Sequence, residues 1–214
     1  MRGDGASVRR GFARGAADWD RRFGDDDYLF GTEPNHFLVT CRDLFDAGGR
    51  ALCVADGEGR NSVWLAGLGM DVDAFDISPV GVAKARRLAE ARGVVVQFEV
   101  AGVDDWRWPR EAYDLVAAVF VQFAPPDLRR RLFARIATTL RPGGVLVLQG
   151  YRVEQLAHGT GGPRVPEQLY TEAQLRSELA DLEIERLESA DVVVEEGTGH
   201  SGPSALIGLV ARRP

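Results

Sequence analysis

The sequence predicts an α/β fold in which a mostly parallel, doubly wound sheet carries helices on both faces. Short apolar runs of strand length occur at about 51–55, 72–75, 94–100, 113–119 and 145–148. Segments with helical spacing separate most of these runs, so strand–helix units repeat along the chain. Right-handed crossovers between parallel strands then determine most of the topology.

The helices are expected from apolar spacing and from residues that begin or end a helix. Ser78 can cap a helix that has Pro79 in its first turn and Gly93 just beyond its end. The predicted helices cover about 34–45, 61–68, 78–91, 126–140 and 171–179.

The last third of the sequence changes character. Two apolar runs, at 184–194 and 205–211, are joined by the polar segment 195–204. We interpret them as an antiparallel hairpin that completes a seven-stranded sheet. With no repeats, residues 1–214 are expected to form a single domain, with 1–14 as a flexible tail and 15–48 as an N-terminal lid and helix.

Composition excludes several classes of protein. The chain has 214 residues, 45% of them hydrophobic and 27% charged, as in ordinary globular domains. A net charge of -6 disfavours nucleic-acid binding, and no apolar run reaches the ~20 residues that span a membrane. Cys41 and Cys53 form no CxxC pair, so we expect buried reduced thiols and no metal site. We therefore expect a cytoplasmic monomer or homodimer that acts on a small molecule.

A glycine turn after the first strand is the main functional signal. Gly57 and Gly59 follow the apolar strand 51–55, and their backbone can approach a ligand closely. Asp76 ends the next strand about 20 residues later, where a carboxylate hydrogen-bonds ribose hydroxyls. Together these features predict a nucleoside site at the carboxyl edge of the sheet.

The charges of this turn discriminate between cofactors. A dinucleotide motif has a third glycine where this chain has Ser62, and it binds a pyrophosphate. Asp56 and Glu58 would repel a pyrophosphate but suit a ligand with an ammonium and a sulfonium. This argument favours S-adenosylmethionine over a nicotinamide dinucleotide.

At this point the chain resembles the class I S-adenosylmethionine-dependent methyltransferases, which have a Rossmann-like fold, over about 51–151. Within them it is similar to the tellurite-resistance type and, more distantly, to thiopurine methyltransferases. The matching segments are GEGRNSVWLA (57–66), DISPVGVAKA (76–85), YDLV (113–116) and LRPGG (140–144), with WDRRF (19–23) and YLFGTEPN (28–35) similar to that subgroup's lid.

The resemblance implies roles for individual residues, with S-adenosylhomocysteine as the product. Asp76 would hold the ribose, and Ile77 would lie beside the adenine. The remaining implied cofactor contacts are Ala55, Gly57, Glu58, Gly59 and Asn61 near the methionine part, Gly102, Val103 and Asp104 near the adenine edge, and Phe120 and Val121 along the reaction cleft. The family usually has an acid at Cys53, a glycine at Ala55 and a further acid at Gly102.

Candidates for the acceptor side follow from side-chain chemistry. Aromatic faces tolerate a cation without competing as nucleophiles, which makes Trp19, Phe23, Tyr28, Phe120 and Phe123 candidates for the lid and cleft. His200 has a pKa range suited to proton removal, and Tyr151 is a second candidate catalytic residue. His158 and Tyr170 belong to a loop that follows the fifth strand and could reach the cleft.

Three functions remain open from the sequence. The first is methyl transfer from S-adenosylmethionine to a thiol, an oxyanion or a hydroxyl of a small molecule. The second is a non-catalytic protein that kept the fold, which Cys53, Ala55 and Gly102 keep open. The third is a nucleotide-dependent oxidoreductase, which Ser62 and the acids of the turn disfavour.

Overall fold

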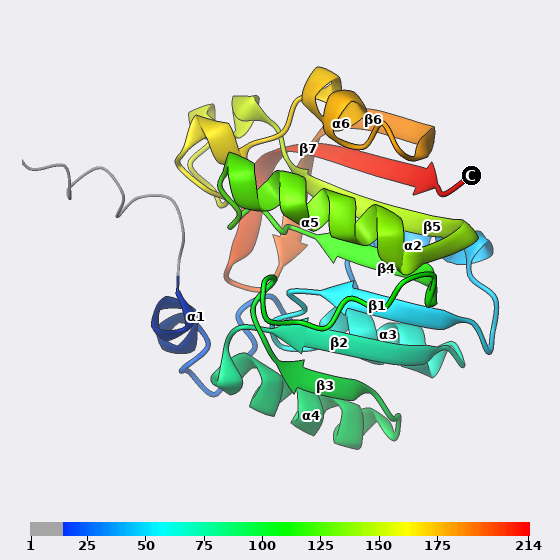
Figure 1. The fold of residues 1–214 in the computed structure, drawn as a ribbon. Coiled ribbons are helices and arrows are strands. Elements are labelled where there is room, and N and C mark those ends of the chain that lie inside the picture. The colour runs from blue at the N-terminus through cyan, green and yellow to red at the C-terminus, as the bar shows by residue number, and fades with distance from the viewer. Residues whose placement is uncertain (1–14) are drawn as a thin grey trace, which may run out of the picture.

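A computed structural model describes residues 15–214, and the predicted tail at 1–14 lies outside the described residues. A seven-stranded sheet forms the centre, in the order β3-β2-β1-β4-β5-β7-β6 (Figure 1). The strands are β1 (Arg50–Val54), β2 (Asp71–Asp76), β3 (Gln97–Val100), β4 (Tyr113–Val119), β5 (Leu140–Tyr151), β6 (Glu183–Glu196) and β7 (His200–Arg212). Strands β1 to β5 are parallel, and β7 is antiparallel to both of its neighbours. The predicted fold class is therefore confirmed.

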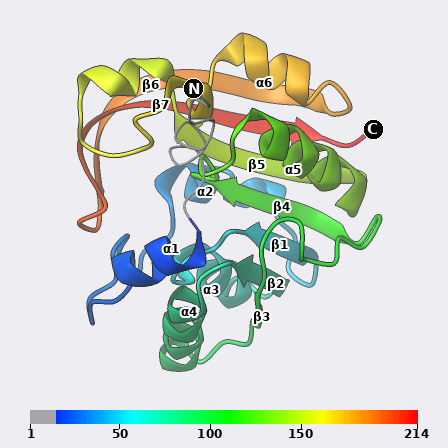
Figure 2. The same cartoon turned by 60° about the vertical axis from the view of Figure 1, so that its left-hand side comes forward.

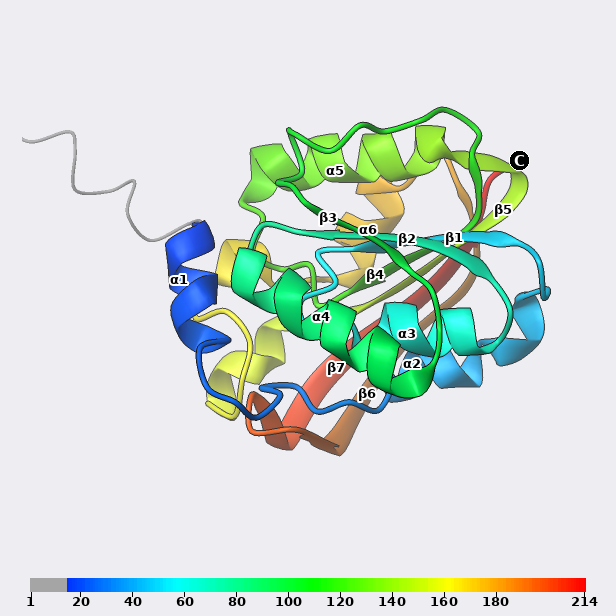
Figure 3. The same ribbon diagram turned by 90° about the horizontal axis from the view of Figure 1, so that it is seen from below.

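Helices cover both faces of this sheet. They are α1 (Ala16–Arg22), α2 (His36–Thr40), α3 (Arg60–Gly67), α4 (Pro79–Arg92), α5 (Pro126–Thr139) and α6 (Glu172–Glu178). Figure 3 shows α5 and α6 on one face and α2, α3 and α4 on the other. Each face has its own apolar cluster, one including Leu132 and Leu175 and the other Leu38 and Leu65, and all four side chains are fully buried.

The chain reverses its winding direction next to β1. Strand β1 pairs with β2 on one side and with β4 on the other, and Cys53 faces Ala74 and Ala117 across these pairings. Helices that leave the two sides in opposite directions open a crevice beyond the carboxyl ends of the strands. The topology therefore places a binding crevice at the ends of β1 and β4.

Most predicted elements occur near their predicted bounds, but four differ. Strand β3 begins at Gln97, three residues later than the predicted strand 94–100. The first predicted helix is shorter, because α2 ends at Thr40 and a separate 3-10 helix covers Arg42–Leu44. Strand β5 begins five residues earlier than the apolar pattern indicated and includes the turn residues of LRPGG. The hairpin is longer than predicted, so His200 is the first residue of β7 rather than part of a loop.

The N-terminal segment is fastened to α4. Asp20 in α1 accepts hydrogen bonds from the hydroxyl of Ser78 and, at 3.4 Å, from the backbone N–H of Val80. The ammonium of Lys84 donates to the carbonyl oxygens of Asp25 (2.9 Å) and Asp27 (2.6 Å). Figure 2 shows α1 beside α4 at the carboxyl edge of the sheet, so this segment covers the crevice.

The described residues contain no helix long and apolar enough to cross a membrane.

Candidate active site

A cavity of about 660 Å³ lies at the carboxyl edge of β1, β2 and β4, under α1 and the tip of the β6–β7 hairpin. Its size is within the range of small-molecule sites, roughly 300–1,000 Å³. Its floor includes Cys53, Ala55 and Ala117 at the ends of neighbouring strands. The cavity therefore lies where the topology predicts a ligand.

Two residues of this floor have unusual backbone conformations. Ala55, just after β1, has φ 49°, and Phe120, just after β4, has φ 55°. Such angles cost a non-glycine residue about 1 kcal/mol or more and cluster at functional sites. Both strands thus turn sharply where they meet the cavity, which brings the Phe120 ring into the lining.

Asp76 is held by backbone groups at the end of β2. Its Oδ2 accepts from the backbone N–H of Gly57 at 2.9 Å, and its Oδ1 accepts from that of Ser78 at 2.8 Å. Burial raises its pKa to about 6, although these two hydrogen bonds lower it. Each oxygen keeps a lone pair, so the carboxylate can accept two hydroxyl groups from a ligand in the cavity.

Asp56 is a second buried carboxyl group in the lining. The Ser62 hydroxyl donates to its Oδ2, whereas its Oδ1 is buried without a hydrogen-bond partner among the described residues. Burial raises the pKa of Asp56 to about 6, the Ser62 hydrogen bond opposes this rise, and the nearby Asp76 adds to it. A cationic ligand would satisfy the free oxygen and stabilise its charge.

The two glycines of the turn have different roles. Gly57 (φ 64°) lines the cavity, and a Cβ there would lie 3.4 Å from the Phe23 ring. Gly59 (φ 92°) lies outside the lining, and a Cβ there would approach the Cβ of Ala85 to 2.7 Å. Gly59 therefore permits close packing of α3 against α4 and does not face the cavity as predicted.

Glu58 also differs from the prediction. Its carboxylate lies 2.5 Å from the ammonium of Lys84, and both side chains are 2% exposed. Because Lys84 neutralises Glu58 away from the cavity, the acid that can act on a ligand in this turn is Asp56. The charge argument for the cofactor therefore depends on Asp56 and Asp76.

The end of the cavity beyond β2 and β3 contains the residues expected beside an adenine. Ile77, Gly102, Val103 and Asp104 all line it. Asp104 is paired with Arg131 and Arg135 at 2.9 Å each, and its hydrogen bond with Arg131 lowers its pKa. Two arginines of α5, Arg131 and Arg135, thus fix the position of Asp104 at this edge of the cavity.

The opposite end of the cavity is aromatic and contains His200. The imidazole lies between the rings of Phe30 (4.4 Å between centroids) and Phe120 (4.2 Å), with Tyr151 at 5.7 Å. Burial lowers the pKa of His200, and the neighbouring Glu196 opposes this change. The ring is consequently neutral at neutral pH and lies in an apolar chamber.

Glu196, at the end of β6, ties this chamber to distant segments. Its carboxylate pairs with Arg60 at 2.7 Å and accepts hydrogen bonds from the Asn35 side chain at 3.0 Å and the His36 backbone at 3.2 Å. Burial acts to raise its pKa, but His200 and Arg60 outweigh burial and hold it at about 2. Glu196 therefore stays ionised beside His200.

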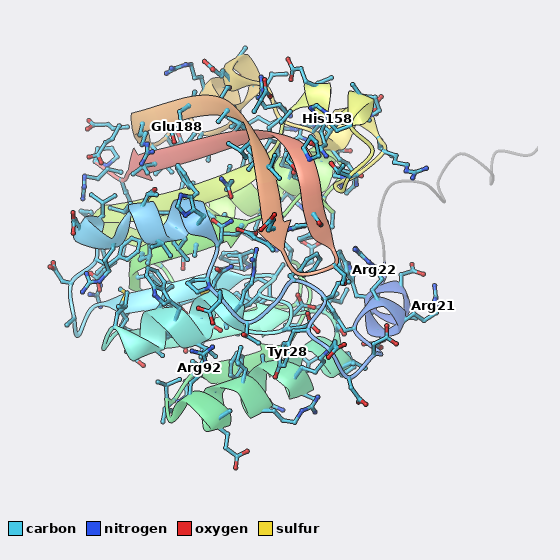
Figure 4. All side chains as sticks on the ribbon, turned by 180° about the vertical axis from the view of Figure 1, so that it is seen from behind. Arg21, Arg22, Tyr28, Arg92, His158 and Glu188 are labelled. Carbon is cyan, nitrogen blue, oxygen red and sulfur yellow. The ribbon has the colours of Figure 1, made fainter. Side chains whose placement is uncertain are left out.

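The N-terminal segment closes the chamber from outside. Trp19 stacks on Phe23 at 5.4 Å between centroids, and the Arg22 guanidinium lies over the rings of Trp19 and Phe30 at 4.7 and 5.6 Å. In Figure 4, Arg22 is on the side of α1 nearest the hairpin tip, whereas Arg21 points away from the molecule. The backbone N–H of Gly199 donates to the carbonyl of Leu29 at 2.8 Å, so hairpin and lid meet directly.

Comparison with known proteins identifies this arrangement. Residues 51–144, which contain the glycine turn and Asp76, match the family model described as a methyltransferase domain. Residues 51–144 are therefore similar to methyltransferase domains. The ubiquinone biosynthesis O-methyltransferase of Xanthomonas axonopodis pv. citri is 31% identical over 138 residues, which are 64% of this chain and 57% of that relative. The chain thus spans little more than half the length of this curated relative.

Solved structures show the same methyltransferase fold. One solved structure comes from work on the conversion of a disulfide bond into a thioacetal group during echinomycin biosynthesis. It has a TM-score of 0.75 at 22% identity, and the alignment covers 91% of this chain and 88% of that chain. The N-methyltransferase NodS of Bradyrhizobium japonicum, in complex with S-adenosylhomocysteine, has a TM-score of 0.70 at 15% identity, with 93% and 98% covered.

The groups that line the cavity fit S-adenosylmethionine. The free Oδ1 of Asp56 suits the cationic methionine part, and the Asp76 carboxylate suits ribose hydroxyls. Ile77 and Val103 offer apolar surface to a base. Asn61 lines the cavity and accepts from the Asn35 backbone at 2.9 Å.

Several residues predicted for the site lie outside the cavity lining. Tyr170 is fully buried beside Phe133 in the core, and His158 is exposed at the end of the 3-10 helix Val153–Ala157. Tyr28 packs against α4, where its hydroxyl donates to the Lys84 carbonyl at 3.2 Å. The full set outside the lining is Glu58, Gly59, Val121, Tyr28, His158 and Tyr170.

The structure also adds lining residues that sequence reasoning missed. They include Arg22, Phe30, Arg60, Gln122 and Gln168, whereas residues 161–165 belong to the loop that was expected to reach the cleft. Phe30 and Arg22 occur in the two N-terminal segments that resemble a lid, so that resemblance was an available signal. The side chain of Gln122 instead bridges the backbone of Tyr151 and Gln168, and no local pattern indicates such a contact.

Proposed function

We propose that this chain transfers the methyl group of S-adenosylmethionine to a small-molecule acceptor that carries a thiol, an oxyanion or a hydroxyl. The observation that carries the proposal is the continuity of one cavity. It runs from the carboxylates Asp56 and Asp76 to the aromatic chamber of Phe120, Tyr151 and His200. A cationic nucleoside at the first end would direct its methyl group toward the second.

Each part of the cavity would contribute binding or orientation. Asp76 accepts the ribose hydroxyls, and Ile77, Gly102, Val103 and Asp104 surround the adenine. Ala55, Gly57 and Asn61 contact the methionine part, with Asp56 near its ammonium. Bound S-adenosylmethionine supplies an already activated methyl group, so the protein mainly aligns the acceptor and excludes water, which can lower a barrier by ~7–11 kcal/mol.

The lid and chamber would exclude water and receive the acceptor. Trp19 and Phe23 in the lid, with Phe123 after β4, supply aromatic surface to the lining. His200 and Tyr151 are the candidate catalytic residues. Burial raises the pKa of Tyr151, so its hydroxyl stays protonated and can donate a hydrogen bond to the acceptor, whereas neutral His200 can take up a proton.

The resemblance to tellurite-resistance methyltransferases adds oxyanions to the candidate acceptors. A chain that binds the cofactor without turnover would favour the alternative of a non-catalytic binding protein, to which the substitutions at Cys53 and Ala55 point. Burial raises the pKa of the Cys53 thiol, with Asp56 adding to the rise, so this lining residue supplies no charge where the family usually has an acid.

Turnover and calorimetry together test the proposal. Purified protein is incubated with S-adenosylmethionine and a panel of thiols, phenols, selenite and tellurite, and formation of S-adenosylhomocysteine is measured. Titrations with S-adenosylmethionine and with NAD run in parallel. We expect the protein to bind S-adenosylmethionine but not NAD, and to turn over at least one acceptor class. Binding without any turnover would support the non-catalytic alternative, and preferential binding of NAD would support the oxidoreductase.

A further inference from the structure

We propose that the acceptor is a phenol whose hydroxyl proton passes to His200, and that Glu196 is the positioning residue that orients this base. The inference rests on the proposed methyl transfer and specifies its acceptor. It depends on a histidine and a carboxylate from the two strands of one hairpin, which meet at the aromatic end of the cavity.

The geometry assigns the two nitrogens of His200 different surroundings. Nδ1 lies 3.8 Å from Oε2 of Glu196 and is buried, which leaves Nε2 as the nitrogen available to the cavity. A separation of 3.8 Å is longer than a hydrogen bond, but such contacts commonly tighten when substrate binds. A proton held on Nδ1 by the carboxylate leaves Nε2 free to accept one.

The carboxylate that faces Nδ1 is itself fixed by three groups at the starts of α2 and α3. Arg60 at the start of α3 pairs with Oε2 at 2.7 Å, and Asn35 before α2 donates to Oε1 at 3.0 Å. The His36 backbone N–H also donates to Oε1, at 3.2 Å. Glu196 is only 15% exposed at its side chain, so it presents a charge of fixed position to the imidazole.

The groups around His200 keep it a neutral base until a proton arrives. Burial among the rings of Phe30, Phe120 and Tyr151 disfavours the charged ring, and the Arg60 and Arg22 guanidiniums oppose it further. Glu196 favours the imidazolium. Its negative charge therefore has most effect after proton transfer, which is when a base needs stabilisation.

This arrangement selects among acceptor chemistries. A thiol with a pKa near 8.5 supplies thiolate without assistance, and an oxyanion needs no base. A phenol has a pKa of about 10 and is protonated at neutral pH, so it gains most from a base. Aromatic lining from Phe30, Phe120 and Phe123 suits a flat ring. Of the three acceptor classes, a phenol therefore gains both from the His200 base and from the aromatic lining.

The step is balanced without further reactants. The phenol oxygen forms a bond to the methyl carbon while the carbon–sulfur bond breaks, and the bonding electron pair remains on sulfur. The hydroxyl proton moves to Nε2 of His200, and the imidazolium is stabilised by Glu196. The products are a methyl ether, S-adenosylhomocysteine and a proton that His200 later releases to water.

A matched pair of acceptors tests the assignment. We compare 4-methylphenol with 4-methylthiophenol at about pH 8. The aromatic thiol is more acidic than an alkyl thiol and is mostly ionised at this pH, whereas the phenol is not. Phenol, catechol and 4-hydroxybenzoate complete the panel. The variants are Glu196→Gln, His200→Gln and, as a control, Glu195→Gln, which changes the exposed neighbour of Glu196. Melting temperature and affinity for S-adenosylhomocysteine are measured for every variant.

The expected result is selective. His200→Gln lowers kcat for the phenol at least 100-fold, and Glu196→Gln lowers it at least 10-fold, with each loss at least 10-fold larger for the phenol than for the thiol. Because Glu196 raises the pKa of His200, its neutralisation also moves the acid limb of kcat/KM for the phenol to lower pH. Glu195→Gln has the kinetics and pH profile of the wild type.

Other outcomes separate the two proposals. Equal losses for phenol and thiol in Glu196→Gln, with an unmoved pH profile, would mean a purely structural Glu196 and would overturn the inference. Turnover of thiols or oxyanions but of no phenol in the panel would overturn it as well, while methyl transfer itself stood. Absence of turnover with every acceptor would count against the proposed function.

Discussion

Replacement of Gly59 by alanine tests the reason for the second glycine of the turn. The new Cβ would lie 2.7 Å from the Cβ of Ala85 and 2.8 Å from its Cα, at a residue with φ 92°. The left-handed conformation costs alanine roughly 1–2 kcal/mol, and overpacking against α4 costs about 1–3 kcal/mol. Alanine also reduces the conformational entropy of the unfolded chain, which stabilises the folded state by about 0.4–1 kcal/mol. The net loss in the free energy of unfolding is therefore expected to be about 1–5 kcal/mol.

A matched control lies at the other end of α3, the helix that Gly59 precedes. A Cβ at Gly67 meets nothing within 4 Å, and its backbone does not have a positive φ, so Gly67→Ala should stabilise the protein by about 0.4–1 kcal/mol. Urea unfolding of both variants, compared at equal m-values, measures the difference. A loss under about 1 kcal/mol for Gly59→Ala, or equal effects of the two variants, would refute the packing explanation.

Three further predictions concern buried charges. Lys84→Met leaves Glu58 buried and unpaired and should cost about 3–5 kcal/mol in urea unfolding, against less than about 1 kcal/mol for Arg92→Met in an exposed pair. Burial raises the pKa of Asp56 from 3.8 to about 6, so the folded state binds more protons than the unfolded state between these pH values. The free energy of unfolding should therefore fall as the pH rises through that window. Asp56→Asn should make this fall smaller in urea unfolding. Affinity for S-adenosylhomocysteine should decrease below about pH 6 as Asp76 is protonated, and a pH-independent affinity measured by calorimetry would contradict its role as a hydroxyl acceptor.

The sheet and the nucleoside end of the site were predictable because their signals are local. A strand, a glycine turn and an acid at the end of the next strand occur within about 30 residues, and parallel pairing brings their ends to one edge. Gly57 and Asp76 consequently line the cavity as predicted. The neighbouring Gly59 and Glu58 fall in the same motif but contact α4, because a spacing pattern does not say which side of a turn faces the ligand.

The acceptor end depends on contacts between distant segments. Glu196 meets Arg60 across 136 residues of sequence and Asn35 across 161, and no periodicity in the sequence indicates such pairs. The sequence pattern predicts His200 as a candidate within a loop. The residue instead begins β7, because hairpin pairing continues through polar residues to Glu196 and His200. Tyr170 was expected near the cleft, yet its ring fills the space beside Gly150 in the core.

The most direct test of the account is a calorimetric titration of S-adenosylhomocysteine into the wild-type chain and into Asp76→Asn. The account predicts one site in the wild type and an affinity at least tenfold weaker in the variant, because hydrogen bonds to a charged group contribute about 1.5–3 kcal/mol. No detectable binding by folded wild-type protein, or equal affinities of the two proteins, would contradict it.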